Sequence, residues 1–314
     1  MTPDGASQRL GWIGVGRMGL PLAGRLVDNG WDVAVYNRTR AKAEPLAERG
    51  AKIVSVPADL ADRDIVFTMV AGSDDFEEVV LGPEGLLSRD GVAPRVIVDS
   101  STVSEDVSVR VREEAAKRDT ALLAAPVSGN PKVVRAGRLT FVVSGPEDAY
   151  ELARPYIEAL GQGATYVGEG ELSRLVKICH NLFLGVVTQS LAEITTLAEK
   201  GGVPRSAFLT FLNNSVMGST FTSYKTPAFV NLDMQPTFTP VLLRKDFDLG
   251  LEAARGLDVP LPVAALVREL IQAVIGKGYT EEDFATMLLV QAEAAGMQLV
   301  SEDADVSDGL SDAT

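Results

Sequence analysis

Cysteine and histidine are almost absent from the sequence. Its 314 residues include one of each, and these stand side by side as Cys179 and His180. A single cysteine excludes a disulfide framework and a cysteine-based metal cluster within one chain, so we expect no metal site. It also fits a reducing compartment, and we expect a cytoplasmic protein.

Positive charge and uninterrupted hydrophobic runs are also scarce. Lysine and arginine number 29 against 43 acidic residues, a formal net charge of -14, which disfavours binding to nucleic acid. The longest apolar stretch is broken by Gln189 and Glu193, which favours a buried helix over a membrane span. The acidic residues 301–314 are expected to form a disordered tail.

The first half of the chain alternates between short β-branched segments and helical patterns, which is typical of βαβ units and a mostly parallel sheet. From Ser173 to Lys200 there is no proline and one glycine. That segment predicts a helix about 40 Å long. We therefore expect an α/β fold: a doubly wound parallel sheet in residues 1–168, then an all-α domain in 169–300, opened by a long interdomain helix.

A glycine-rich turn follows the first expected strand. Gly14, Gly16 and Gly19 form G-x-G-x-x-G where that strand meets its helix. Such glycines permit a tight turn and close approach of the backbone to a pyrophosphate at the helix N-terminus. The pattern predicts a Rossmann-type dinucleotide site that includes the intervening residues Val15, Arg17 and Met18.

The end of the second expected strand bears on which dinucleotide binds. An acidic residue there selects NAD by bonding the ribose 2′-hydroxyl. This chain has Asn37 instead, followed by Arg38, Thr39 and Arg40. A neutral side chain does not repel a 2′-phosphate and an arginine can pair with it, so we expect NADP, with NAD possible. Alternatively, these arginines are only solvated.

The long expected helix carries the candidate catalytic residues. Lys177 and Asn181 are spaced i, i+4 and share one face, so the lysine could exchange a proton with a substrate that the amide binds. Cys179 points away from that face, and we expect it to pack as a small hydrophobe. His180 is a secondary candidate for shaping the pocket.

Six motifs together resemble one enzyme family. They occur in the order and approximate spacing found in the β-hydroxyacid dehydrogenases, which include 3-hydroxyisobutyrate dehydrogenases and glyoxylate/succinic semialdehyde reductases: "GWIGVGRMGLPLAGRL", "NRT", "VDSST", "APVSG", "KICHN" and "RKDFDLGLEAA". The resemblance covers roughly residues 9 to 298. It implies an NADP-dependent oxidoreductase that transfers hydride between nicotinamide and a small β-hydroxyacid or the corresponding aldehyde or keto acid.

The resemblance also implies roles for single residues. Lys177 matches the catalytic general acid/base, and Asn181 matches the asparagine that orients the substrate. Further residues match substrate contacts (Ser128, Gly129, Asn130, Lys245, Asp246) and cofactor contacts beyond the glycine turn (Asn37, Arg38, Thr39, Val70, Thr102, Lys245), with Ser101 beside Thr102.

Some positions depart from the family pattern. Asn130 and Val133 replace glycines near the expected carboxylate site, while Glu171 and Ser173 replace glycines ahead of Lys177. None of these changes removes a residue that matches a catalytic group, so we expect them to bear on the substrate more than on the reaction.

Two other functions stay open. An imine reductase would share this architecture but typically carries Asp or Tyr at the position of Lys177. A non-catalytic NADP-binding module would be expected to lose the lysine. The long helix is apolar on more than one face, which predicts an oligomer. The resemblance implies a homodimer or homotetramer.

Overall fold

The computed structural model describes residues 8–310, and the chain divides into two compact units, 1–177 and 178–314. The division lies between Lys177 and Ile178, later than the predicted boundary at 168/169. The first turns of the long helix therefore belong with the sheet.

The first unit is built on a six-stranded parallel sheet in the order β3-β2-β1-β4-β5-β6. The strands are β1 (Leu10–Ile13), β2 (Val33–Tyr36), β3 (Lys52–Ile53), β4 (Ile65–Thr68), β5 (Val96–Asp99) and β6 (Ala121–Ala124). This order reverses between β1 and β4, and ligands bind at the carboxyl ends of the strands near such a reversal. The predicted doubly wound sheet is confirmed.

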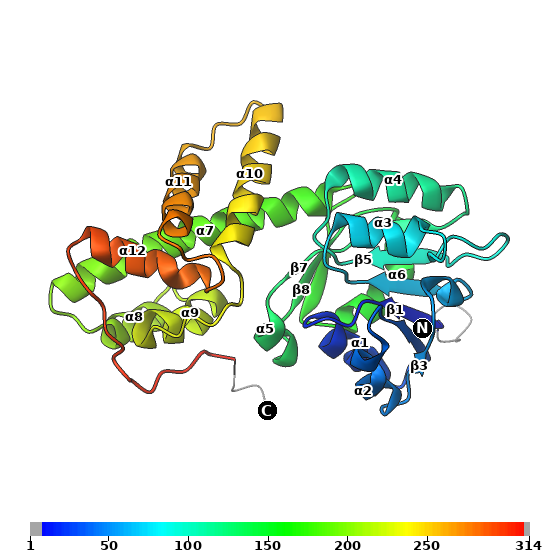
Figure 1. Cartoon of the computed structure of the whole chain (residues 1–314), viewed down its shortest axis with the longest axis horizontal. Helices are drawn as coiled ribbons and strands as arrows, with labels where there is room; N and C mark the ends of the chain where they lie inside the picture. Colours follow the sequence, from blue (N-terminus) through cyan, green and yellow to red (C-terminus); the bar gives the residue numbers. More distant parts are fainter. Residues whose placement is uncertain (1–7, 311–314) are drawn as a thin grey trace. The chain divides into compact units, whose positions relative to one another are not determined.

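Helices cover both faces of this sheet (Figure 1). α1 (Gly19–Asp28) and α6 (Glu147–Ala159) contribute to one hydrophobic core, while α3 (Ser73–Leu81) and α4 (Glu105–Ala116) contribute to another on the opposite face. Successive strand residues point to opposite faces, so Trp12 joins the first core and Ile13 the second. After β2 come only the 3₁₀ helix η1 (Arg40–Lys42) and the short α2 (Glu44–Ala47), and a second 3₁₀ helix, η2 (Pro57–Leu60), follows β3.

A second, three-stranded sheet completes this unit. It has the order β7-β8-β9, formed by β7 (Val127–Ser128), β8 (Thr140–Val143) and β9 (Gly163–Tyr166). β7 and β8 are antiparallel and are connected through the short helix α5 (Pro131–Arg135).

The second unit is all-α, as predicted. It begins within α7 (Leu172–Lys200) and continues through α8 (Arg205–Asn214), α9 (Thr220–Asn231), α10 (Pro240–Gly256), α11 (Pro262–Gly276), η3 (Phe284–Thr286) and α12 (Met287–Ala294). By length and composition alone, α7 could cross a membrane, but the core helices of soluble proteins pass the same test.

Two glycines let α7 and α10 approach closely. A Cβ on Gly185 would overlap the ring of Phe247, and a Cβ on Gly250 would overlap the side chain of Leu182. The same crossing places Asn181 of α7 beside Asp246 of α10.

The second unit contains a buried ion pair. Lys225 Nζ lies 2.5 Å from Asp283 Oδ1 and 4.1 Å from the centre of the Phe284 ring. Thr237 donates to the other carboxylate oxygen through its backbone N–H and its hydroxyl. The pair is thus buried with its hydrogen-bonding capacity largely used.

The prediction of a disordered tail is wrong for residues 301–310. The Glu302 carboxylate accepts hydrogen bonds from the backbone N–H groups of Arg205 and Ser206 at the start of α8. Asn231 and Ala304 exchange two further hydrogen bonds. Acidic composition suggested a solvated tail, but these carboxylate and backbone groups find partners on the helices. Residues 311–314 lie outside the described part of the chain.

Candidate functional site

The glycine turn has the geometry of a dinucleotide cradle. Gly14 has a φ of +95°, and a Cβ there would collide with the carbonyl of Met69. A Cβ on Gly19 would collide with the Gly14 carbonyl, whereas one on Gly16 would meet nothing within 4 Å. Gly14 and Gly19 therefore close the turn, and exposed Gly16 leaves its outer side open to a pyrophosphate.

Asn37 holds this turn against the end of β2. Its Oδ1 accepts a hydrogen bond from the backbone N–H of Val15 at 2.9 Å, and its Nδ2 donates to the carbonyl of Thr39 at 2.8 Å. Asn37, which stands where NAD-selective proteins have an acidic residue, thus hydrogen-bonds to the neighbouring backbone through both ends of its amide.

Arg38 is exposed beside the cradle. Its side chain is 84% accessible and pairs with Asp75 of α3 at 3.0 Å. An ion pair this exposed contributes little, so a phosphate could compete for the guanidinium. Arg17, Thr39 and Arg40 are also exposed, while Met18 packs against the core beneath the turn.

The loops after β4 and β5 are joined at the same edge of the sheet. The backbone N–H of Val70 donates to Ser101 Oγ at 2.9 Å, and the neighbouring Thr102 is exposed. The structure thus brings the predicted cofactor residues of the first unit to the carboxyl edge near the reversal in strand order.

The predicted carboxylate site is a constrained loop after β7. Gly129 has a φ of +140°, and a Cβ there would lie 2.8 Å from a Val133 methyl group. Asn130 is buried, and its Oδ1 accepts from the N–H groups of Lys132 and Val133. Its Nδ2 is buried without a hydrogen-bond partner among residues 8–310. Beside Ser128, the loop therefore presents an additional donor.

On α7, the structure shows how Asn181 is held. Its Nδ2 donates to Asp246 Oδ2 at 2.6 Å, and its Oδ1 lies 2.9 Å from His180 Nδ1. A carboxylate only accepts, so the amide nitrogen faces Asp246 and the His180 ring must donate to the amide oxygen. His180 thus has a positioning contact that sequence reasoning did not specify. Lys245, the residue before Asp246, is exposed.

Lys177 and Asn181 lie on one continuous helix, four residues apart as expected. Lys177 is half-buried and is the last residue of the first unit, whereas Asn181, Lys245 and Asp246 belong to the second.

The prediction that Cys179 packs as a buried hydrophobe is wrong. Cys179 is exposed, in line with exposed Leu175, Val176 and Phe183. These positions form one stripe of α7, and a small apolar residue on an uncovered stripe stays accessible. Among residues 8–310, no group of three or more His, Cys, Asp or Glu side chains could hold a metal ion.

Two family models match almost the whole chain. Residues 9–168 match the NAD-binding domain of 6-phosphogluconate dehydrogenase, and residues 171–291 match the NAD-binding domain of NADP-dependent 3-hydroxyisobutyrate dehydrogenase.

Several known proteins are similar along most of their length. The chloroplastic glyoxylate/succinic semialdehyde reductase 2 of Arabidopsis thaliana is 30% identical over 89% of this chain and 78% of its own. The mitochondrial 3-hydroxyisobutyrate dehydrogenase of Mus musculus is 29% identical over 88% and 85%. Psf3, solved in complex with NADP+ and 2-OPP, has a TM-score of 0.77 at 25% identity and covers 90% of this chain and 99% of its own.

An imine reductase from Pseudomonas sp. has a TM-score of 0.58 at 18% identity, over 90% of this chain and 98% of its own. That likeness extends to the fold alone.

Fold, glycine cradle and family matches together define an NAD(P)-dependent oxidoreductase that acts on CH–OH groups. The chain belongs to the β-hydroxyacid dehydrogenase family.

Gly16→Ala tests the cradle. Because the new methyl group meets no protein atom, the Tm without cofactor should stay the same or rise slightly. The NADPH dissociation constant should rise about tenfold or more, since the methyl group occupies the approach of the pyrophosphate. Calorimetry of NADPH binding measures this. Gly30→Ala is the control. A Cβ there would also meet nothing within 4 Å, but Gly30 has a φ of +80° just after α1, so its Tm should fall while its affinity for NADPH stays the same. Unchanged affinity in Gly16→Ala would refute the placement.

Proposed function

We propose that this protein is an NADP-dependent reductase or dehydrogenase of a small β-hydroxyacid and its aldehyde or keto acid, with Lys177 as general acid/base. The observation that carries the proposal is the arrangement on α7: Lys177 stands one turn before Asn181, whose amide is fixed by Asp246 and His180. Glyoxylate, succinic semialdehyde and 3-hydroxyisobutyrate are the first substrates to test, because similar proteins are named for them.

The proposed steps assign one task to each group. The Ser128 hydroxyl, the Gly129 N–H and the spare Asn130 Nδ2 bind the substrate carboxylate. The second N–H of the Asn181 amide holds the substrate hydroxyl, because the first is directed at Asp246. Lys177 takes the hydroxyl proton in oxidation and returns it in reduction. The nicotinamide, when bound, supplies the hydride chemistry.

The preference for NADP rests on Arg38 and on the absence of an acidic residue at position 37. Arg38→Ala should lower kcat/KM for NADPH about 10- to 100-fold, because a charge-assisted bond to the 2′-phosphate is lost, and should leave that for NADH nearly unchanged. Steady-state kinetics with both cofactors measure the ratio. Asp75→Asn is the control: it removes the carboxylate that pairs with Arg38 and should not lower kcat/KM for NADPH. Equal losses with both cofactors would contradict the assignment.

The runner-up function is an imine reductase of the same fold. A panel of aldehydes, keto acids and cyclic imines, run with NADPH and NADH in parallel, separates the two. The proposal would be overturned if the protein reduced cyclic imines but none of the aldehydes or keto acids.

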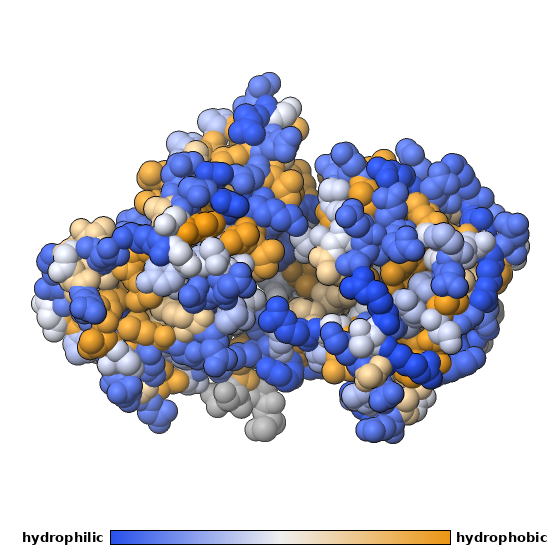
Figure 2. Space-filling model, in the orientation of Figure 1, coloured by the Kyte–Doolittle hydropathy of each residue, from blue (hydrophilic) through white to orange (hydrophobic). Residues whose placement is uncertain are grey.

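We also propose an oligomeric state, a cellular location and a class of partner for this protein. Figure 2 shows hydrophobic surface on the helical unit. The exposed hydrophobic side chains of this unit include Leu197 at 73% and Phe211 at 72% accessibility. They support a homodimer or homotetramer that covers them. A single cysteine supports a cytoplasmic location. The acidic charge supports small-molecule partners, with neither nucleic acid nor membrane among them.

A further inference from the structure

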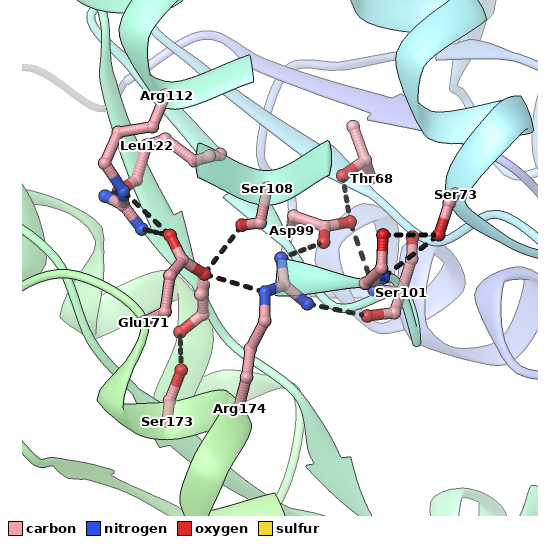
Figure 3. Close-up of polar contacts among 12 residues, drawn as sticks. Thr68, Ser73, Asp99, Ser101, Ser108, Arg112, Leu122, Glu171, Ser173 and Arg174 are labelled. Carbon is pink, nitrogen blue, oxygen red and sulfur yellow. Dashed lines mark hydrogen bonds and ion pairs between the residues drawn. The ribbon is translucent and has the colours of Figure 1, made fainter. Parts of the chain in front are cut away.

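A buried polar network surrounds the start of α7 (Figure 3). It joins Glu171 and Arg174, next to and within the first turn of this helix, to Asp99 at the end of β5. Asp99 has no exposed surface, and Arg174 is 7% exposed. All of these residues lie in the first unit, together with Lys177.

Arg174 is the centre of this network. Its Nε donates to Glu171 Oε2 at 2.8 Å, its Nη2 to Asp99 Oδ2 at 2.9 Å, and its Nη1 to the carbonyl of Ser101 at 3.2 Å. A planar guanidinium bound at three nitrogens fixes both the position and the rotation of the helical turn from which it projects.

Glu171 provides the second anchor. It accepts from the Ser108 hydroxyl at 2.7 Å and from Arg112 at 2.6 Å and 2.9 Å. Burial raises the pKa of Glu171, but the Ser108 hydroxyl and the Arg112 and Arg174 guanidiniums more than offset this, so its pKa lies below the ordinary 4.5. The carboxylates of Asp99 and Glu171 therefore balance the charges of Arg112 and Arg174. Buried charges are tolerated when they are paired and hydrogen-bonded in this way.

The network continues into the loops assigned to the cofactor. Asp99 Oδ1 also accepts from the Thr68 hydroxyl at 2.7 Å and from the Ser101 N–H at 3.1 Å. Ser101 Oγ then accepts from the Val70 N–H. A continuous path of hydrogen bonds thus leads from the first turn of α7 to the ends of β4 and β5.

The geometry points to Arg174 as a positioning residue that holds the turn bearing Lys177 at a fixed place relative to the loops of Val70 and Ser101. The inference rests on the proposed role of Lys177. Arg174 and Lys177 are three positions apart, so they are neighbours on the surface of one helical turn, and a shift of that turn carries the lysine with it. Proton transfer requires hydrogen-bond distance, and a displacement of about 1 Å can cost about 100-fold in rate.

The test compares Arg174→Met with Lys225→Met. Both remove a buried cation from an ion pair, but Lys225 lies in the second unit, outside the network. Arg174→Met should lower kcat about 10- to 100-fold, with KM for NADPH changed less than about threefold. Lys225→Met, assayed below its Tm, should keep kcat. Arg174→Lys should recover part of the loss, because its ammonium can still pair with Asp99 but lacks the planar fork of nitrogens that reaches Glu171, Asp99 and Ser101 together.

Hydrogen exchange gives a readout that needs no substrate. Arg174→Met should accelerate exchange of the Val70 and Ser101 amides about tenfold or more, and Lys225→Met should leave both unchanged. Unchanged exchange at these two amides in Arg174→Met would overturn the proposal, as would a kcat equal to that of Lys225→Met.

A double variant separates this inference from the proposed function. If Arg174 acts through Lys177, adding Arg174→Met to Lys177→Ala should lower the residual turnover less than twofold, since no lysine remains to be positioned. Full additivity would sink the positioning role. High turnover in Lys177→Ala alone would instead sink the proposed function.

Discussion

Lys177→Ala is expected to lower kcat about 10²- to 10⁴-fold, the usual range for removing a general acid/base. NADPH binding should survive, because the cradle of Gly14, Gly16 and Gly19 is built from other segments of the chain. Stopped-flow measurement of hydride transfer, together with calorimetric NADPH binding, separates the two effects.

Lys200→Ala is the matched control for this variant. Lys200 lies on the same helix but at its last residue, where Nζ donates to the carbonyl of Ala295. Its loss should change kcat less than about twofold. Near-normal turnover in Lys177→Ala would show that another group moves the proton.

Lys225→Met is expected to lower the free energy of unfolding by about 3–5 kcal/mol, because it leaves Asp283 charged and buried without its partner. Urea unfolding at neutral pH measures the loss. Lys277→Met removes the exposed pair with Glu293 in the same unit and should cost no more than about 1 kcal/mol. Similar losses in both variants would contradict a special role for the buried pair.

The same pair predicts a dependence of stability on pH. Burial raises the pKa of Asp283, but Lys225 and the hydrogen bonds of Thr237 and Ala285 outweigh it, so the pKa lies below the ordinary 3.8. A lowered pKa contributes stability that is present above 3.8 and is lost as the pH falls through the folded-state value. Unfolding titrations should show this acid loss in the wild type and a smaller one in Lys225→Met. An equal loss in both would refute the coupling.

The sheet and the long helix follow from local patterns in the sequence. β-Branched segments alternate with helical ones, and the uninterrupted helical segment predicted from Ser173 to Lys200 is α7 with one further residue at its start. The glycine turn was predictable for the same reason, because its requirements are met within one βαβ unit.

The features that the sequence did not predict depend on contacts between segments far apart in the chain. The Arg174–Asp99 pair joins residues 75 positions apart, and nothing in either segment identifies the other as its partner. Likewise, the acidic composition of residues 301–310 could not reveal that Glu302 bonds the start of α8. The exposure of Cys179 depends on which stripe of α7 other helices cover. The assigned roles of Lys177, Ser128 and Lys245 stay predictions.

One measurement tests the central claim most directly: consumption of NADPH by the purified protein with succinic semialdehyde or glyoxylate, compared with Lys177→Ala. The account predicts carbonyl-dependent oxidation of NADPH by the wild type and a loss of at least about 100-fold in the variant. Equal rates in the two proteins, or oxidation only with cyclic imines, would contradict it.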